Sequence, residues 1–264
     1  MDDAFAAAAQ TAGGRFHFTR TTPVTIEARA SVAEYDKGAR SLTLHCTTQI
    51  PGIVRDKLSE IFDLPGPRIR VIAPDVGGGF GGKTSLYSEE IVACAIARDL
   101  GRPIKWVSDR MEDLMTTGNA FDEIVDAEIA VDNDGKILAV KADVIGDVGA
   151  YSIYPWTATI EPVQVVSFLP GPYRIANYAA RVRAVATNKT LTGAYRGVGR
   201  PISVFVMDRL LDMAARKIGM DPAEIRRRNL VNDDEFPYKA ASGLVWDKSA
   251  FQACLAVAAE NIGY

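Results

Sequence analysis

The run Gly77-Gly78-Gly79-Phe80-Gly81-Gly82 constrains this chain of 264 residues more than any other feature. The segment 68–74 before it is typical of a short apolar strand, and the residues after it carry apolar side chains at helical spacing until Gly101, which can end a helix. Because glycine has no Cβ atom, the backbone amides of such a loop can approach a ligand closely. A glycine loop between a strand and a helix therefore predicts the binding of a phosphorylated or anionic group.

Three interpretations of this loop are open on local evidence. Gly77 to Thr84 satisfies the pattern G-x-x-x-x-G-K-[ST] of nucleotide phosphate-binding loops, in which Lys83 would contact phosphate and Thr84 would hold Mg²⁺. Asp109 could then serve as the acidic partner. The same glycines also fit the dinucleotide pattern G-x-G-x-x-G, but no clear acidic residue follows at the distance of about twenty residues that this motif needs. The third interpretation is a tight turn that lets the strand and the helix pack closely.

The rest of the chain predicts a mixture of strands and helices, and hence an α+β fold. One hairpin is expected from strands at 24–36 and 41–48, and a second around Asn133-Asp134-Gly135, whose residues tolerate positive φ. The stretch 149–172 is rich in aromatic residues and prolines and predicts a structured loop. Further strands are expected at 103–108 and 177–188, and helices at 51–62, at 201–218, after the cap residue Asp221 and at the end of the chain.

The composition argues against several classes of function. With 30 Lys+Arg against 33 Asp+Glu, the net charge of −3 gives little attraction for nucleic acid, and no apolar run of membrane-spanning length is present. The three cysteines are far apart, so they predict buried thiols rather than disulfides or a thiolate metal site. Two histidines are too few for a three-histidine zinc site. The acidic N-terminus is unlike a signal peptide, and a cytoplasmic chain is expected.

Several further motifs accompany the glycine loop PDVGGGFGGK. They are Thr47-Thr48-Gln49 with Pro51 after it, then GAYRGVGRP at 193–201, and finally DPAEIRRRNL followed by FPY. In this order and spacing the motifs resemble the molybdenum-cofactor-binding subunit of the xanthine dehydrogenase, aldehyde oxidase and carbon monoxide dehydrogenase family. The resemblance covers nearly the whole chain. A nucleoside triphosphatase has no reason to carry the other motifs, so the resemblance favours a coincidental phosphate-loop match at Lys83 and Thr84.

The resemblance implies that residues 1–264 form the N-terminal half of a molybdopterin-binding domain whose C-terminal half is absent from this chain. In that family a pyranopterin dithiolene holds the molybdenum, and no protein side chain bonds to the metal directly. Gln49 matches the glutamine whose amide lies against an oxygen ligand of molybdenum. The other implied cofactor-binding residues lie in two loops, one passing the metal and one approaching the dithiolene and pterin: Gly78, Gly79, Phe80 and Gly81, and Ala194, Tyr195, Arg196 and Gly197.

Three departures from well-known members limit the implied reaction. Members that oxidise carbon monoxide carry a cysteine that holds copper where this chain has Gly197. Members that oxidise purines carry a glutamate and an aromatic residue where this chain has Thr84 and Val198, two positions expected in the substrate pocket. A site without that carboxylate and that aromatic face should not select xanthine. The resemblance therefore implies hydroxylation of an aldehyde or an aromatic N-heterocycle, with oxygen taken from water.

No catalytic residue is predicted within the chain, because the family's general base is a glutamate near the end of the full subunit. The implied cofactor is molybdenum–molybdopterin, either in its simple form or as the cytosine dinucleotide. The implied partners are the complementary C-terminal half, an iron–sulfur subunit, a FAD subunit and a small-molecule substrate. The alternative function is nucleotide binding through a phosphate-binding loop formed by Gly77 to Thr84.

Overall fold

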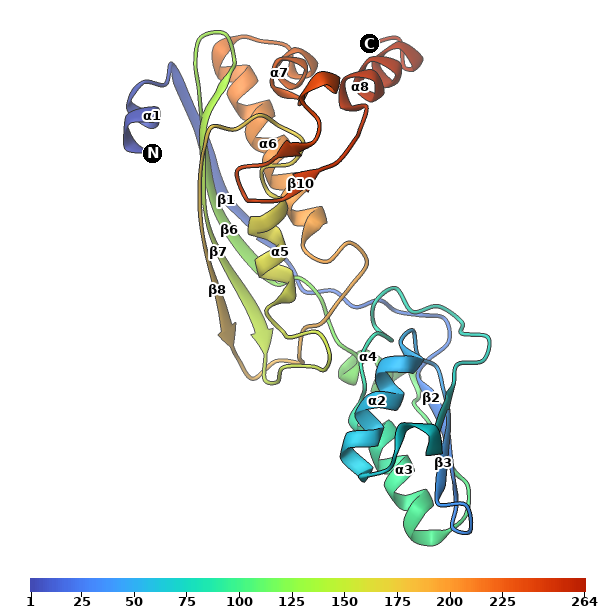
Figure 1. The fold of residues 1–264 in the computed structure, drawn as a ribbon. Helices are drawn as coiled ribbons and strands as arrows, with labels where there is room; N and C mark the ends of the chain where they lie inside the picture. The colour runs from blue at the N-terminus through green and yellow to red at the C-terminus, as the bar shows by residue number, and fades with distance from the viewer.

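The computed structural model describes residues 1–264 and places them in two lobes (Figure 1). The small lobe contains residues 24–117, and the large lobe contains residues 1–18 and 119–264. Each lobe has a hydrophobic core of its own, with 13 buried residues in the small lobe and 22 in the large lobe. The chain starts in the large lobe, builds the small lobe and then returns, so the cofactor-binding residues predicted near positions 80 and 195 come from different lobes.

The small lobe is a four-stranded sheet with two helices packed on one face. Strand order is β4-β3-β2-β5, with β3 and β4 parallel and the other pairs antiparallel. Leu42, Leu44 and Cys46 alternate along β3 and enter the core, where they join Val54 and Leu58 of α2. The elements are β2 (Ala30–Asp36), β3 (Ser41–Cys46), α2 (Pro51–Phe62), η1 (Gly66–Arg68), β4 (Ile69–Ile72), α3 (Ser88–Leu100), β5 (Ile104–Val107) and α4 (Arg110–Thr116).

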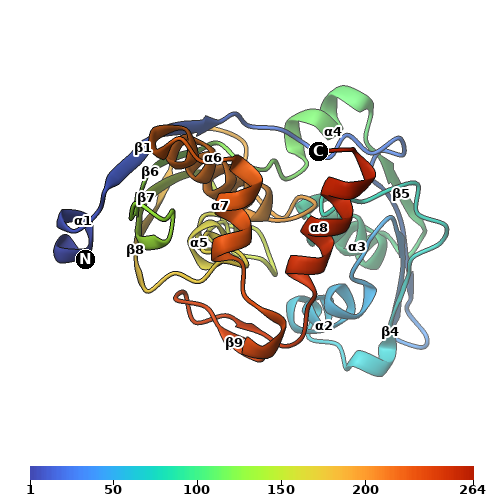
Figure 2. The same ribbon diagram turned by 90° about the horizontal axis from the view of Figure 1, so that it is seen from above.

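The large lobe is a second four-stranded sheet, in the order β1-β6-β7-β8, with β7 and β8 parallel and the other pairs antiparallel. Helices α5 and α6 lie against one face of this sheet (Figures 1 and 2). Gly135 closes the β6–β7 hairpin with a φ of +76°, as the Asn-Asp-Gly turn predicts. The elements are β1 (Gln10–Phe18), β6 (Glu123–Val131), β7 (Ile137–Gly149), α5 (Ile160–Phe168), β8 (Asn177–Ala186) and α6 (Arg200–Ile218).

The remaining elements lie at the two ends of the chain. Asp221 caps the start of α7 by accepting hydrogen bonds from the amides of Ala223 and Glu224, as its position before Pro222 predicts. No helix in the structure combines the length and the apolar character that a membrane crossing needs. The elements are α1 (Asp2–Ala6), α7 (Pro222–Asn229), η2 (Asp233–Glu235), β9 (Tyr238–Lys239), β10 (Val245–Trp246) and α8 (Phe251–Asn261).

The α+β class, both hairpins and most of the helices predicted from sequence are confirmed, with three corrections. Residues 149–172 are not only a loop, because they contain α5; Pro162 lies in its first turn, where proline is tolerated. Strand β1 was not predicted, because its sequence QTAGGRFHF lacks a clear alternation, and its pairing with the distant β6 determines it. Cys254 is exposed, whereas Cys46 and Cys94 are buried as expected.

Candidate functional site: a cleft between two glycine loops

The first loop, residues 76–84, leaves β4 and turns back on itself. Gly78 and Gly81 have φ values of +97° and +100°, and Phe80 between them has a φ of +48°. These left-handed conformations are accessible to glycine at no steric cost, but they are unusual for phenylalanine. The loop is closed by hydrogen bonds from the amides of Gly82 and Thr84 to the carbonyl oxygens of Gly79 and Gly81. The turn leaves the Phe80 side chain about half exposed at the surface of the loop.

Gln49 holds this loop through its side chain and its backbone. Its Oε1 accepts hydrogen bonds from the amides of Gly81 (3.0 Å) and Lys83 (3.3 Å), and its own amide donates to the carbonyl oxygen of Lys83 (2.9 Å). A Cβ atom at Gly79 would lie 2.3 Å from Oε1, so only glycine allows this approach. Because the two amide donors engage Oε1, the Nε2 group of the exposed Gln49 side chain is free to donate a hydrogen bond to a ligand.

Lys83 does not have the geometry of a phosphate-binding lysine. Its side chain is only 1% exposed, and Nζ lies 2.9 Å from Oε2 of Glu27, which also accepts a hydrogen bond from the amide of Gly77 (2.7 Å). Burial raises the pKa of Glu27, but the hydrogen bonds from Lys83 and Gly77 outweigh it and lower the pKa below its usual value. Lys83 therefore fastens the loop to its own lobe instead of reaching into open space.

The other parts of the phosphate-loop interpretation also fail. In that motif the helix follows the lysine directly, whereas here α3 begins only at Ser88. The hydroxyl of Thr84 donates to the carbonyl oxygen of Gly81, so it is not free for Mg²⁺. Asp109 caps α4 by accepting from the amide of Glu112 (2.7 Å). Nothing in the structure favours nucleotide binding at this loop.

The second loop, residues 193–199, connects β8 to α6 and has a similar backbone. Gly197, Val198 and Gly199 have φ values of +97°, +43° and +71°, so a non-glycine residue again takes a left-handed conformation between glycines. The loop turns through a hydrogen bond from the amide of Val198 to the carbonyl oxygen of Tyr195 (2.7 Å). Behind it, a Cβ atom at Gly199 would lie 2.5 Å from the carbonyl oxygen of Glu161 in α5. The loop is therefore pressed against the first turn of that helix.

The structure brings the two loops into direct contact. The amide of Arg196 donates a hydrogen bond to the carbonyl oxygen of Phe80 (2.9 Å). A Cβ atom at Gly81 would lie 2.3 Å from the carbonyl oxygen of Ala194, so the absence of a side chain there allows the contact. The convergence of two distant glycine loops, which the resemblance predicts, is thus present, and the individual contacts with the cofactor stay predictions.

A cleft of about 270 Å³ lies where the loops meet, between the two lobes. Thr84 and Val198, the predicted substrate-pocket residues, both line it. Trp156, Ile160 and Gln164 line it as well, and sequence reasoning missed all three because it took 149–172 for a loop. The aromatic and proline content of that stretch was the available signal. The full lining is Phe80, Gly81, Thr84, Trp156, Ile160, Gln164, Ala194, Tyr195, Arg196 and Val198.

The two loops carry hydrogen-bond donors that the chain does not use. The guanidinium of Arg196 is exposed and forms no ion pair with the chain. The backbone amides without an acceptor within the chain include those of Gly79, Phe80, Ala194, Tyr195 and Gly197. Amide donors and an unpaired cation around one cleft favour a ligand with negative charge and several acceptor atoms.

Two buried carboxyl groups lie behind the second loop. Glu123 and Glu161 are each 1% exposed, and Glu161 accepts a hydrogen bond from the amide of Phe121 (2.6 Å). Both oxygens of Glu123 and the other oxygen of Glu161 have no hydrogen-bond partner. Burial raises the pKa of each group to about 8, and the nearby Glu161 adds to the effect on Glu123. Both groups are therefore protonated over most of the physiological pH range.

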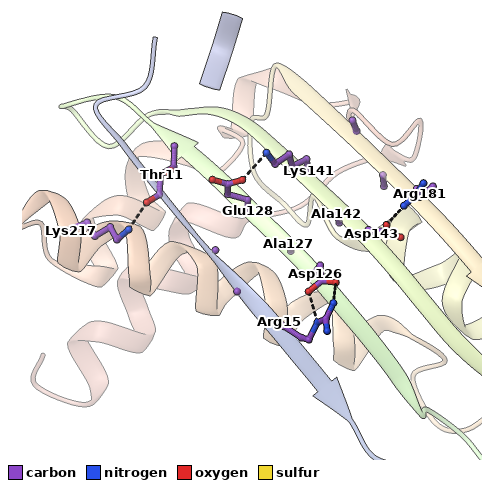
Figure 3. A pocket seen from close by; sticks show the side chains of 14 residues that line it. Thr11, Arg15, Asp126, Ala127, Glu128, Lys141, Ala142, Asp143, Arg181 and Lys217 are labelled. Atoms are coloured by element: carbon purple, nitrogen blue, oxygen red, sulfur yellow. Dashed lines mark hydrogen bonds and ion pairs between the residues drawn. The ribbon is translucent and has the colours of Figure 1, made fainter. Parts of the chain in front are cut away.

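A larger hollow lies elsewhere, on the face of the large-lobe sheet that α5 and α6 leave open (Figure 3). It measures about 860 Å³, but it is an open surface lined by charges that already pair with one another. The pairs are Arg15–Asp126, Lys141–Glu128 and Arg181–Asp143. Because these cations are neutralised, this face has less to offer an anionic cofactor than the cleft between the loops.

The cleft offers main-chain amides to a ligand, and the structure contains no group of side chains that could hold a metal ion. The sequence profile of the molybdopterin cofactor-binding domain matches residues 1–230. This chain belongs to that family. Its predicted membership is confirmed.

The curated relatives and solved structures are consistent with this assignment. The chain is 34% identical to the carbon monoxide dehydrogenase large chain of Hydrogenophaga pseudoflava, over 100% of this chain and 33% of that protein. It is 33% identical to the nicotine 6-hydroxylase large subunit of Paenarthrobacter nicotinovorans, over 100% of this chain and 32% of that protein. Quinoline 2-oxidoreductase from Pseudomonas putida 86 superposes with a TM-score of 0.96 at 35% identity, over 99% of this chain and 33% of that chain. The chain thus spans about a third of the length of these relatives.

Proposed function

We propose that this chain forms the first part of the cofactor-binding region of a molybdenum hydroxylase, which oxidises an aldehyde or an aromatic N-heterocycle with oxygen from water. The observation that carries the proposal is the contact between the two glycine loops, where the Arg196 amide meets the Phe80 carbonyl oxygen beside several unused amide donors. Family membership supports the nature of the cofactor. The activity, the substrate and the partners belong to the whole protein, of which this chain represents a part.

The residues of the chain act on the cofactor by hydrogen bonding and charge. The free Nε2 of Gln49 would donate to an oxygen ligand of the metal, because Oε1 is held by the amides of Gly81 and Lys83. The unused amides of Gly79 and Phe80 lie in the loop that Gln49 holds and would supply further donors to the cofactor. Arg196 compensates the negative charge of sulfur and phosphate groups through its fixed set of donors. These groups position the cofactor before substrate arrives, which is the usual contribution of residues around a metal centre.

The bound cofactor supplies the two-electron oxidation of the substrate carbon. None of the chain's own carboxylates lines the cleft, so the general base that accepts a proton is assigned to the part of the protein outside this chain. The electrons must leave through further carriers, for which we propose an iron–sulfur subunit and a FAD subunit. The descriptions "large chain" and "large subunit" of the relatives are consistent with a complex of several subunits.

The cleft lining supports the proposed substrate class. Trp156, Ile160, Val198 and the exposed Phe80 give it apolar walls that suit a flat or small organic molecule. Thr84 contributes no charge. Carbon monoxide is not the proposed substrate, because Gly197 carries no thiol; a Cβ atom there would also lie 2.7 Å from Cγ of Pro201 at a φ of +97°. Nicotine and quinoline, named in two of the relatives, are aromatic N-heterocycles.

The proposal is tested by co-expressing the chain with the products of its neighbouring genes and purifying the complex. Metal analysis and pterin fluorescence should show molybdenum and pterin in stoichiometric amounts. Release of cytidine monophosphate on acid hydrolysis would identify the cytosine dinucleotide form, and its absence the simple form. A purified complex that contains neither molybdenum nor pterin would contradict the proposal. Fractionation of the producing cells tests the expected cytoplasmic location.

A further inference from the structure

The first loop and the second loop are also connected by a route on the side away from the cleft. This route runs through Tyr87, which is the residue before α3 and is 6% exposed. Its hydroxyl donates a hydrogen bond to the carbonyl oxygen of Gly82 in the first loop (2.6 Å) and accepts one from the amide of Gly118 (3.0 Å). One side-chain oxygen thus joins the first loop to the segment that follows α4.

The segment after α4 is in turn bonded to the start of the second loop. The residue after Gly118 is Asn119, whose amide donates to the carbonyl oxygen of Leu191 (3.0 Å) and whose carbonyl oxygen accepts from the amide of Gly193 (2.8 Å). Asn119 and Thr192 form a parallel β-bridge at this point. A displacement of Gly118 therefore displaces the beginning of the second loop.

The ring of Tyr87 is fixed by a buried cation. The guanidinium carbon of Arg29 lies 3.8 Å from the ring centroid, and Arg29 is only 2% exposed. Arg29 is itself held by hydrogen bonds to Thr117 (3.0 Å) and Glu89 (3.2 Å). Burial raises the pKa of Tyr87 to about 12, so the hydroxyl keeps the proton that it donates to Gly82. The hydroxyl oxygen is therefore held in place by its two hydrogen bonds and by the packing of the ring against Arg29.

We propose that Tyr87 is a positioning residue that sets the separation of the two cofactor loops. The direct contact from the Arg196 amide to the Phe80 carbonyl oxygen fixes the loops at the cleft, and Tyr87 fixes them behind it. Two connections of this kind prevent one loop from tilting against the other. Tyr87 does not line the cleft, so it acts on the cofactor only through the two loops.

The test compares Tyr87→Phe with Tyr173→Phe in the assembled complex. Both tyrosines are 6% exposed, and each variant removes one buried hydroxyl. The hydroxyl of Tyr173 bonds to Asp208 of α6 (2.9 Å), which belongs to neither loop. A purely structural effect should therefore be similar in the two variants, and a positioning effect should occur in Tyr87→Phe alone.

Two readouts distinguish positioning from general stability. In complex purified from cells that cannot make the cofactor, hydrogen exchange of amides at 79–82 and 193–197 should be about 10-fold faster in Tyr87→Phe than in wild type. In the complex with cofactor, the Mo(V) electron paramagnetic resonance spectrum should change and the turnover per bound molybdenum should fall about 10-fold, the usual scale for residues that act on a metal through others. Tyr173→Phe should match wild type in both.

Wild-type exchange rates and a wild-type spectrum in Tyr87→Phe would overturn the proposal. If Tyr87→Phe does not fold, Arg29→Lys serves instead, since it keeps a positive charge but removes the guanidinium that lies 3.8 Å from the centroid of the Tyr87 ring. It should speed exchange in the same two segments by a smaller factor, and unchanged exchange there would overturn the proposal. The role proposed for Tyr87 rests on the proposed function, but the two can fail separately. A wild-type complex without molybdenum would contradict the proposed function alone, because the hydrogen-exchange comparison needs no cofactor.

Discussion

The two loops that meet in the cleft have similar backbones but are held in place differently. Each contains a left-handed non-glycine residue, Phe80 or Val198, next to glycines with positive φ. The first loop is fastened by side chains of its own lobe: Gln49, Glu27 and Tyr87 all bond to its backbone. The second loop is instead held by side chains of the helix that follows it: Arg200 and Ser203 of α6 donate to the carbonyl oxygens of Gly197 (3.2 Å) and Gly199 (3.1 Å). It also lies against α5 and the first loop.

The carboxyl groups behind the two loops differ in whether a cation pairs with them and in the direction of their pKa shifts. Glu27 behind the first loop is paired with the buried Lys83, and its pKa is lowered. Glu123 and Glu161 behind the second loop have no cation partner at hydrogen-bond distance, and their pKa values are raised to about 8. The comparison teaches that the first loop is held by side chains from distant parts of its own lobe, whereas the second loop is held by the helix that follows it and by the first loop, and leaves Arg196 free.

The largest effect is expected where the two loops touch. Gly81→Ala places a methyl group 2.3 Å from the carbonyl oxygen of Ala194 at a φ of +100°, so the loops must separate. Molybdenum content of the purified complex should fall roughly 100-fold, because the substitution breaks a buried backbone contact and also forces alanine into a strained conformation. Gly52→Ala on α2, where a Cβ atom meets nothing within 4 Å, is the control and should retain full content. Normal molybdenum content in Gly81→Ala would mean that the loop contact is not needed.

Removing the ion pair between Glu27 and Lys83 that holds the first loop should destabilise the protein. Lys83→Met removes the partner of Glu27 but keeps a side chain of similar length, and the free energy of unfolding should fall by about 2 kcal/mol. Urea denaturation checks this value. Calorimetry should detect no ATP binding in either the variant or the wild type. Tight ATP binding by wild type that is lost in Lys83→Met would instead favour the phosphate-loop interpretation.

The carboxyl groups of the two loops should give pH dependences of opposite sign. A raised pKa means that the folded state holds protons that the unfolded state has lost, so Glu123 and Glu161 make stability fall as pH rises from about 4.5 to about 8. Glu123→Gln should remove part of this fall and be more stable than wild type by about 1–2 kcal/mol at alkaline pH. Denaturation curves at mildly acidic and mildly alkaline pH measure the difference. An equal effect of the substitution at both pH values would contradict the assigned protonation.

Glu27→Gln is the matched comparison for the first loop. The lowered pKa of Glu27 means that its ion pair stabilises the folded state above the usual carboxyl pKa and that this contribution is lost as pH falls below it. The variant should therefore be less stable than wild type near neutral pH, and the difference should vanish in acid. A difference that persists in acid would show that lost packing, rather than charge, is responsible.

The smallest effect is expected for the free cation of the second loop. Arg196→Ala removes an exposed side chain that the chain itself does not use, so the melting temperature should not change. Retention of the cofactor during dialysis should fall roughly fivefold, because one set of charge-assisted hydrogen bonds is lost. Arg209→Ala, an exposed arginine on α6, is the control for net charge. Equal retention of the cofactor in the two variants would show that Arg196 does not contribute to cofactor binding.

The sequence predicted the parts of this molecule that depend on local patterns. The glycine loop, Gln49 and the Arg196 loop were identified by their motifs, and the hairpins by alternation and turn residues. Local patterns do not show which strands or side chains pair with partners far away in the sequence. Strand β1 forms against β6, and Glu27 pairs with the buried Lys83 across the small lobe, so neither could be read from neighbouring residues. The same is true of Gln164, which reaches the cleft because α5 lies behind the second loop.

The most direct test of the account is the position of molybdenum in a crystal of the assembled complex, located by anomalous scattering. The account predicts one molybdenum peak for this chain, in the cleft beside the loops of Phe80 and Arg196 and facing the amide of Gln49. A peak elsewhere, for example on the open face of the large-lobe sheet near Arg15 and Arg181, would contradict it.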